Sequence, residues 1–168
     1  EPLTSCINPS ELFTYFLPSD AIAYAYIAAM YISTLIAGIF GYRIGKIYSK
    51  DNRICTIAAL LFAFSGYISL WGQQPLFGSA YSLMIVYTYY LLTCSFEGLK
   101  KEMCLIVSLC LITLDGYYFL YMAGFFSALY LVVRGIYNKT SWKVVGKELI
   151  HLLRVGIITI FLCAFTLA

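Results

Sequence analysis

The chain has 168 residues, of which 62% are hydrophobic and only 11% are charged. Soluble domains carry about 25% charged residues, so this composition excludes an ordinary domain that is surrounded by water. Apolar stretches of about 20 residues, the length that a helix needs to cross a bilayer, recur along the chain, and the alternating segments of a membrane barrel do not. We therefore predict an all-α fold, a polytopic transmembrane bundle of about six membrane helices with additional interfacial helices.

The first predicted element is a short helix at residues 9–17. Asn8 is a suitable N-cap, Pro9 suits the first helical position, and Glu11 follows the cap by three residues. Pro18 closes the segment. Because its sequence is apolar and aromatic, we expect this helix to lie along the outer membrane interface.

Gaps between charged residues predict the next three elements, which are membrane spans at residues 21–42, 54–71 and 78–96. Basic residues lie between the first two spans and after the third. The positive-inside rule makes these basic connections cytoplasmic. The residues concerned are Arg43, Lys46, Lys50, Arg53, Lys100 and Lys101.

Small residues recur every fourth position near the end of the first span, at Ser33, Ala37, Gly41 and Gly45. Small side chains at this spacing allow two membrane helices to approach closely. We expect a packing face here and not a substrate site.

Residues 103–133 contain one charged residue, Asp115. A single helix over this range would be about 46 Å long and would place the five following basic residues outside. Two helices at residues 103–114 and 117–133, broken at Asp115-Gly116, keep them inside. Asp-Gly is a common turn dipeptide, so we predict a pair of short helices here.

The depth of this turn suggests a role for Asp115. Residues 103–114 rise only about 18 Å, less than the thickness of the hydrocarbon core. Irregular backbone at that depth is tolerated where it is buried in protein or lines a wet cavity. One hypothesis is a recessed, water-filled vestibule with Asp115 at or near its floor. The alternative is that Asp115 caps the following helix at a locally thinned interface.

The last two predicted elements are an inner amphipathic helix at residues 140–154 and a final span at 155–168. The chain stops inside this apolar span and has no initiator Met, so we expect it to be a piece of a longer protein.

The predicted outer side gathers an acid, amides and aromatic rings, and it carries no basic residue. Such groups suit a sugar, whose hydroxyls need hydrogen bonds and whose ring faces need cover. The alternative is the aromatic belt that forms at any membrane interface. Nothing indicates a nucleic-acid partner, a metal site or a soluble cofactor. The predicted substrate-binding residues are Asp115, Tyr117, Tyr118, Trp71, Gln73 and Gln74.

Four stretches resemble the YfhO-like bacterial membrane proteins, which have the architecture of the GT-C glycosyltransferases. These stretches are INPSELFTYFLP, LIAGIFGYRIGK, AALLFAFSGYISLW and DGYYFLYMAGFFSALYLVVR. The resemblance implies a multi-pass protein of the bacterial plasma membrane. Such an enzyme takes a sugar from a polyprenyl-phosphate donor and attaches it, on the outer face, to a cell-envelope polymer such as a teichoic acid.

The usual catalytic acid of that architecture lies upstream of the matched region, so the resemblance assigns no catalytic residue here. The expected partners are the lipid bilayer, the lipid-linked sugar and the polymer acceptor. A transporter or flippase of a polar or lipid-linked solute is the alternative function, because broken helices and embedded acids suit that class as well. A purely structural subunit is a third possibility.

Overall fold

The computed structural model describes residues 16–71, 75–93 and 99–164. Within these ranges the fold is all-α, as predicted. The helices are α2 (Ser19–Tyr48), α3 (Asn52–Ala63), α4 (Gly66–Trp71), α5 (Pro75–Thr93), α6 (Leu99–Asp115), α7 (Tyr117–Tyr137) and α8 (Trp142–Leu162).

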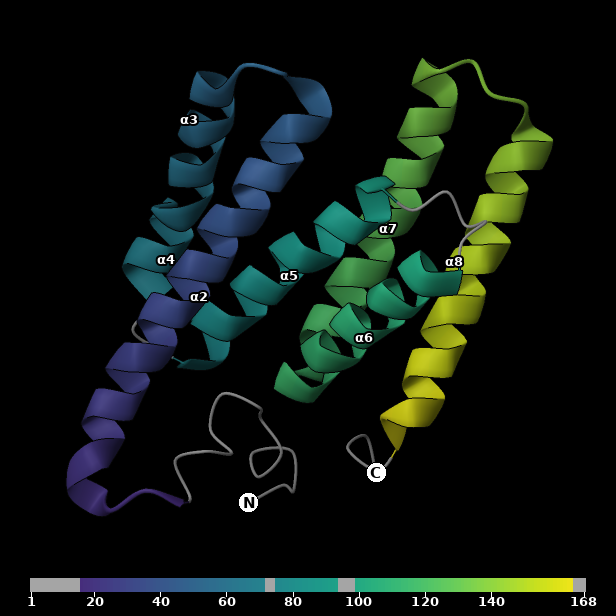
Figure 1. Ribbon diagram of the computed structural model, residues 1–168. Coiled ribbons are helices and arrows are strands. Elements are labelled where there is room, and N and C mark those ends of the chain that lie inside the picture. Colours follow the sequence, from purple (N-terminus) through teal and green to yellow (C-terminus); the bar gives the residue numbers. More distant parts are fainter. Residues whose placement is uncertain (1–15, 72–74, 94–98, 165–168) are drawn as a thin grey trace.

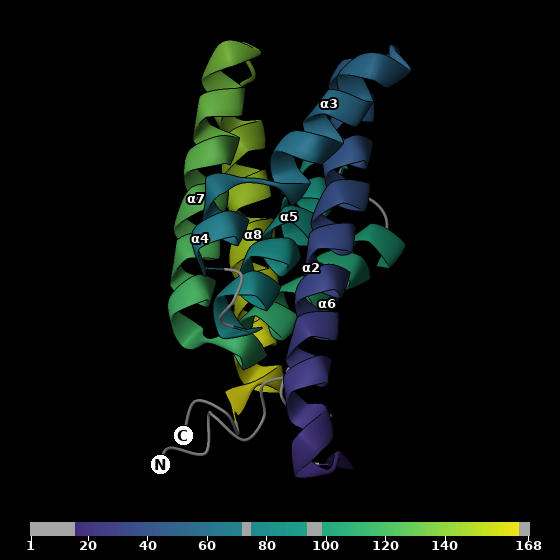
Figure 2. The same cartoon turned by 90° about the vertical axis from the view of Figure 1, so that its left-hand side faces the viewer.

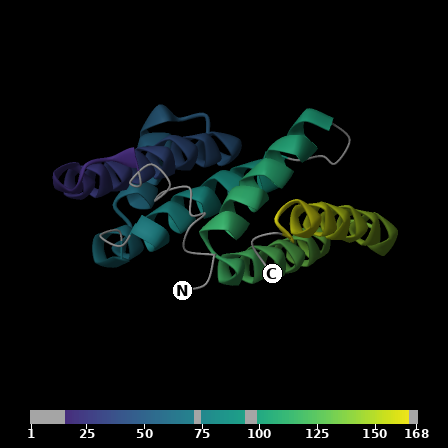
Figure 3. The same ribbon diagram turned by 90° about the horizontal axis from the view of Figure 1, so that it is seen from below.

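The helices form two outer hairpins on either side of a central pair. α2 packs along α3 at one edge of the molecule, and α7 packs along α8 at the other (Figure 1). α5 and α6 run obliquely between these hairpins, so that α5 contacts α2 while α6 contacts α7 and α8. The views from the side and from below show the same arrangement (Figures 2 and 3). Consecutive elements are therefore neighbours in space.

The larger core cluster lies where α5, α6, α7 and α8 meet. Its fully buried side chains include Tyr87, Leu105, Ile112 and Val155. The Tyr87 hydroxyl and the Ser127 Oγ are 2.7 Å apart, and both residues are fully buried. A hydroxyl pair of this kind satisfies two polar groups that would be costly to bury alone. It also links α5 to α7.

Two glycines of α2 allow a close contact between neighbouring helices. A Cβ atom built on Gly41 would lie 2.8 Å from Cδ2 of Phe62, and one built on Gly45 would lie 3.0 Å from the Cα of Cys55. Both neighbours belong to α3. The predicted packing face is therefore confirmed for Gly41 and Gly45.

Two helices in the described ranges, Asp20–Tyr48 and Tyr118–Tyr137, are long and apolar enough to cross a membrane. Only 6% and 22% of their most apolar windows are buried inside the protein. The core helix of a soluble protein would be mostly buried. In these two helices large apolar side chains are exposed instead, among them Tyr31, Leu35 and Phe125. Exposed apolar surface of this extent is typical of a face that contacts lipid or another protein.

The structure divides one predicted span and joins two other predicted elements. The range 54–71 is split between α3 and α4, where the Ile68 amide lies 3.4 Å from the Ser65 Oγ. Serine followed by glycine favours such a helix restart. In contrast, the predicted helix at 140–154 and the predicted span at 155–168 form the continuous helix α8, because an isolated Gly156 does not break a helix.

Other predicted boundaries shift by several residues. The first span (21–42) extends to Tyr48, and the third (78–96) begins earlier, at Pro75. Most of the predicted interfacial helix at 9–17 lies outside the described residues, as do 94–96 and 165–168.

Candidate functional site at the Asp115 bend

The chain reverses direction where the sequence predicted a break. α6 ends at Asp115 and α7 begins at Tyr117, with Gly116 in an extended conformation between them (φ 173°, ψ 131°). The Gly116 amide donates to the Ile112 carbonyl at 3.0 Å, and the Phe119 amide donates to the Gly116 carbonyl at 3.0 Å. These backbone groups on either side of the bend are thus hydrogen-bonded within the protein.

The Asp115 carboxylate is buried against α5. Only 4% of the residue is exposed, and the Ser79 hydroxyl donates to Oδ2 at 2.6 Å. A hydrogen bond to a charged acceptor is shorter and stronger than one between neutral groups. The structure therefore closes the position at which the vestibule hypothesis expected water, and Ser79 adds a tertiary partner that the capping hypothesis did not include. The N-cap residue of α7 is Gly116.

Ser79→Ala is expected to lower the free energy of unfolding by about 2 kcal/mol, because it removes a donor from a buried carboxylate. Ser82→Ala is the matched control, since Ser82 is also buried on α5 but donates to the Ser79 carbonyl in its own helix. Thermal unfolding of the purified chain in detergent would compare the two. Equal effects would show that the bond to Asp115 adds nothing to stability.

An aromatic groove of about 470 Å³ adjoins the bend. Ala80, the residue after Ser79, lines it from α5, and α2, α3, α4 and α7 supply the other walls. The Tyr67 and Tyr81 rings stack with centroids 5.2 Å apart and an interplanar angle of 19°. The aromatic side chains of the groove are Phe62, Tyr67, Tyr81, Tyr118, Phe119 and Phe126.

The structure brings together some of the predicted site residues. Tyr118 lines the groove, and Asp115 lies beside it through Ser79. Tyr117 is the first residue of α7 and Trp71 is the last of α4. Gln73 and Gln74 lie outside the described residues.

Ser79 and the groove were not predicted from the sequence. Ser79 is separated from Asp115 by 36 positions, and a single serine in an apolar helix carries no signal of such a contact. Tyr67 and Tyr81 could be recognised only as aromatic residues on either side of the connection between the second and third spans. Their stacking depends on how α4 and α5 pack, which local sequence does not specify.

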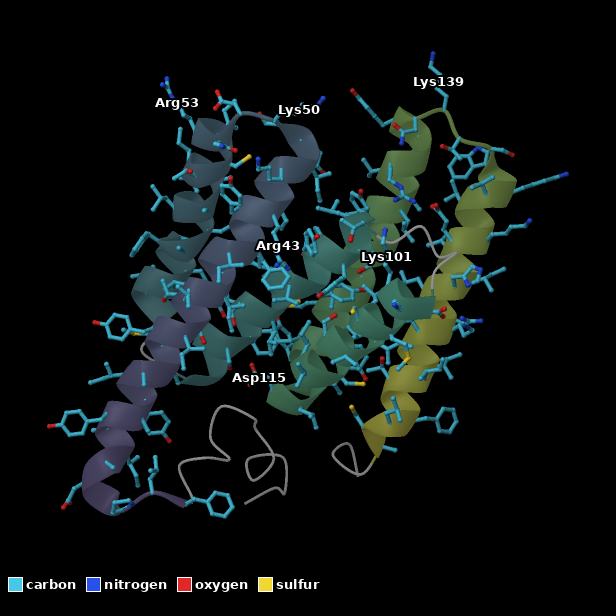
Figure 4. The ribbon with its side chains drawn as sticks, in the orientation of Figure 1. Arg43, Lys50, Arg53, Lys101, Asp115 and Lys139 are labelled. Atoms are coloured by element: carbon cyan, nitrogen blue, oxygen red, sulfur yellow. The ribbon has the colours of Figure 1, made fainter. Side chains whose placement is uncertain are left out.

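The bend and two of the three basic connections lie at different ends of the bundle, and Lys101 of the third lies between them (Figure 4). Lys50 and Arg53 at the α2–α3 turn and Lys139 at the α7–α8 turn share one end, and Asp115 lies toward the other (Figure 4). The described residues include no group of three or more His, Cys, Asp or Glu side chains placed to hold a metal ion. We assign no metal site.

Comparison with known proteins does not identify a family for this chain. No family model matches the chain, and neither a curated protein nor a solved structure does so.

Proposed function

We propose that the chain is part of an integral membrane glycosyltransferase of the bacterial plasma membrane, related to the YfhO-like proteins. The enzyme would use a polyprenyl-phosphate-linked sugar to modify a cell-envelope polymer on the outer face. One observation carries the proposal: a buried carboxylate, Asp115, lies at a helix break beside a groove lined by aromatic rings. Ionisable groups inside a membrane are costly and are usually kept for a function.

The proposed membrane arrangement has six crossings. They are α2, α3 with α4, α5, α6, α7 and the apolar part of α8. The basic turns would face the cytoplasm and the bend would lie toward the outer side. Support comes from the position of Lys50, Arg53 and Lys139 at one end of the bundle and of Asp115 nearer the other (Figure 4).

In this proposal the aromatic rings cover an apolar portion of the substrate, and the carboxylate accepts a hydrogen bond from a hydroxyl. Tyr118 is available for such a contact because 63% of it is exposed. Because only 4% of Asp115 is exposed, the substrate hydroxyl would reach its carboxylate by displacing the Ser79 hydroxyl. Roles for Tyr117, Trp71, Gln73 and Gln74 remain predictions from the sequence, and no catalytic residue is assigned.

Asp115→Asn in the complete protein is expected to lower sugar transfer at least tenfold while membrane expression stays unchanged, because an amide is a weaker acceptor than a carboxylate. The measurement is incorporation of labelled sugar from a polyprenyl-phosphate donor into envelope polymer in isolated membranes. Asp20→Asn is the control, since Asp20 is an exposed acid in the first turn of α2. Wild-type transfer by Asp115→Asn would remove Asp115 from the substrate site and leave it a structural residue.

A transporter or flippase remains the second candidate because the groove lies between two broken helices. Phe62 and Tyr67 line it from either side of the α3–α4 break, and Tyr118 and Phe119 line it just after the α6–α7 break. Discontinuous helices at a binding site are typical of secondary transporters. Movement of labelled solute or lipid across proteoliposomes, without formation of a glycosylated product, would favour this function over the transferase.

A further inference from the structure

A second groove, of about 560 Å³, runs along the outward face of α2 and ends at a cation. It follows α2 from Tyr31 to Arg43, and Ala63 and Phe64 at the end of α3 complete it. Gly38 forms its hollow, where a Cβ atom added to the glycine would lie 3.5 Å from the Ala63 Cβ. The groove shares no residue with the aromatic groove beside Asp115.

The length of this groove corresponds to one leaflet of a bilayer. The rise from Tyr31 to Arg43 is about 18 Å along the helix axis, and half of the hydrocarbon core is about 15 Å thick. Its walls are apolar and face outward, since Leu35 is 64% exposed and Phe64 is 69% exposed. An extended acyl chain therefore matches the groove in both length and polarity.

Arg43 lines the end of the groove that is nearer the α2–α3 turn, and Lys46 follows it on α2 by about one helical turn. The Arg43 guanidinium carbon is 5.1 Å from the centre of the Phe40 ring and 5.9 Å from the centre of the Tyr89 ring on α5. Arg43 is exposed, so its side chain can turn toward the groove. The Lys46 ammonium is 5.7 Å from the centre of the Tyr42 ring. Lys46 also donates to the Asn52 Oδ1, which is neutral, at 2.7 Å. In the part of the chain that the structure describes, neither cation forms an ion pair with a carboxylate.

The position of Arg43 fits the level of a lipid phosphate. Lys50 and Arg53 lie at the very end of the bundle, whereas Arg43 lies further down the helix (Figure 4). The seven-residue separation of Arg43 from Lys50 corresponds to about 10 Å. With the turn in water, Arg43 would meet the headgroup region while the rest of the groove faces hydrocarbon.

We propose that this groove binds an anionic phospholipid, with the phosphate held by Arg43 and Lys46 and one acyl chain lying over Gly38 toward Tyr31. The site is independent of the proposed glycosyl transfer, because it shares no residue with the aromatic groove and needs no catalytic group. A zwitterionic lipid would gain the same apolar contact, but without the net attraction that each basic side chain adds near a membrane surface.

Native mass spectrometry of the detergent-solubilised chain tests the charge requirement. Dioleoyl-phosphatidylglycerol is expected to bind at least tenfold more tightly than dioleoyl-phosphatidylcholine. The double variant Arg43→Gln with Lys46→Gln should lose about tenfold in affinity for the anionic lipid. The matched double variant Lys50→Gln with Arg53→Gln removes the same charge from the turn and should change it less than twofold. Equal losses in the two variants would overturn the proposal.

A second pair of variants tests the groove. Gly38→Leu would fill the hollow and is expected to weaken phosphatidylglycerol binding about tenfold, whereas Gly124→Leu, at a glycine of α7 with open space around it, should leave it unchanged. Size-exclusion chromatography checks that both variants fold. Unchanged binding by Gly38→Leu would overturn the placement of the acyl chain. Displacement of the lipid by millimolar inorganic phosphate would identify a phosphate site instead and would overturn the lipid assignment.

Discussion

Replacing Gly45 with leucine is expected to lower the free energy of unfolding by about 3 kcal/mol, because no space exists for a side chain between α2 and α3. A Cβ atom there would lie 3.0 Å from the Cα of Cys55 and 3.3 Å from the Cβ of Ala58. Backbone cannot rotate away as a side chain can, so the two helices would have to separate. For a chain of this size the corresponding drop in Tm is roughly 6–12 °C.

Thermal unfolding in detergent, followed by size-exclusion chromatography, measures this effect. Gly124→Leu introduces the same side chain at a helical glycine with open space around it and is expected to change the unfolding free energy by less than about 1 kcal/mol. Gly41→Ala should lie between the two, since the atoms that it meets belong to the side chain of Phe62. If Gly45→Leu unfolds together with the control, the α2–α3 contact is looser than the structure has it.

Removing Arg154 is expected to cost about 2–3 kcal/mol, because it leaves the Glu102 carboxylate without its cation. The Arg154 guanidinium on α8 pairs with Glu102 on α6, whose side chain is only 12% exposed. Arg154 itself is 55% exposed, so solvent screening keeps the cost below that of a fully buried pair. Arg154→Met retains most of the apolar stem while removing the charge.

A double replacement separates the cost of an orphaned charge from the value of the pair. Glu102→Leu combined with Arg154→Met is expected to recover most of the lost stability, because the partly buried Glu102 carboxylate is then replaced by an apolar side chain of similar size and needs no cation. Lys147→Met, at an exposed lysine of the same helix, controls for the loss of one charge. Unfolding in mixed SDS micelles would measure all three. No recovery in the double variant would mean that the ion pair itself stabilises the α6–α8 contact.

The sequence predicted those features of the fold that depend on composition and on local chemistry. Few charges and long apolar stretches indicate an all-α membrane-type fold, and Asp115-Gly116 marks the chain reversal. Gly41 and Gly45 could be recognised as a packing face because small residues at a spacing of four have one common use in membrane helices. Each of these signals lies within a few residues of the feature that it predicts.

The features that depend on tertiary contact could not be predicted in this way. The charge pattern separated residues 140–154 from 155–168, but Arg154 lies inside the continuous helix α8, where it pairs with Glu102 on α6. Likewise, Asp115 was expected near water, but its carboxylate is buried and accepts a hydrogen bond from Ser79 on α5. Ser79 is 36 positions from Asp115, and Glu102 is 52 positions from Arg154. The residues around Asp115 or Arg154 in the sequence do not indicate such distant partners.

The conformation of Gly116 determines which residues can replace this glycine in related sequences. With φ at 173°, the residue occupies ordinary extended backbone, which alanine or serine adopts as readily as glycine. A methyl group there would lie 3.3 Å from the edge of the Phe119 ring, a crowding that a small ring movement relieves. Distant descendants could therefore lose the Asp-Gly dipeptide and keep the reversal, and a motif search for that dipeptide would overlook them.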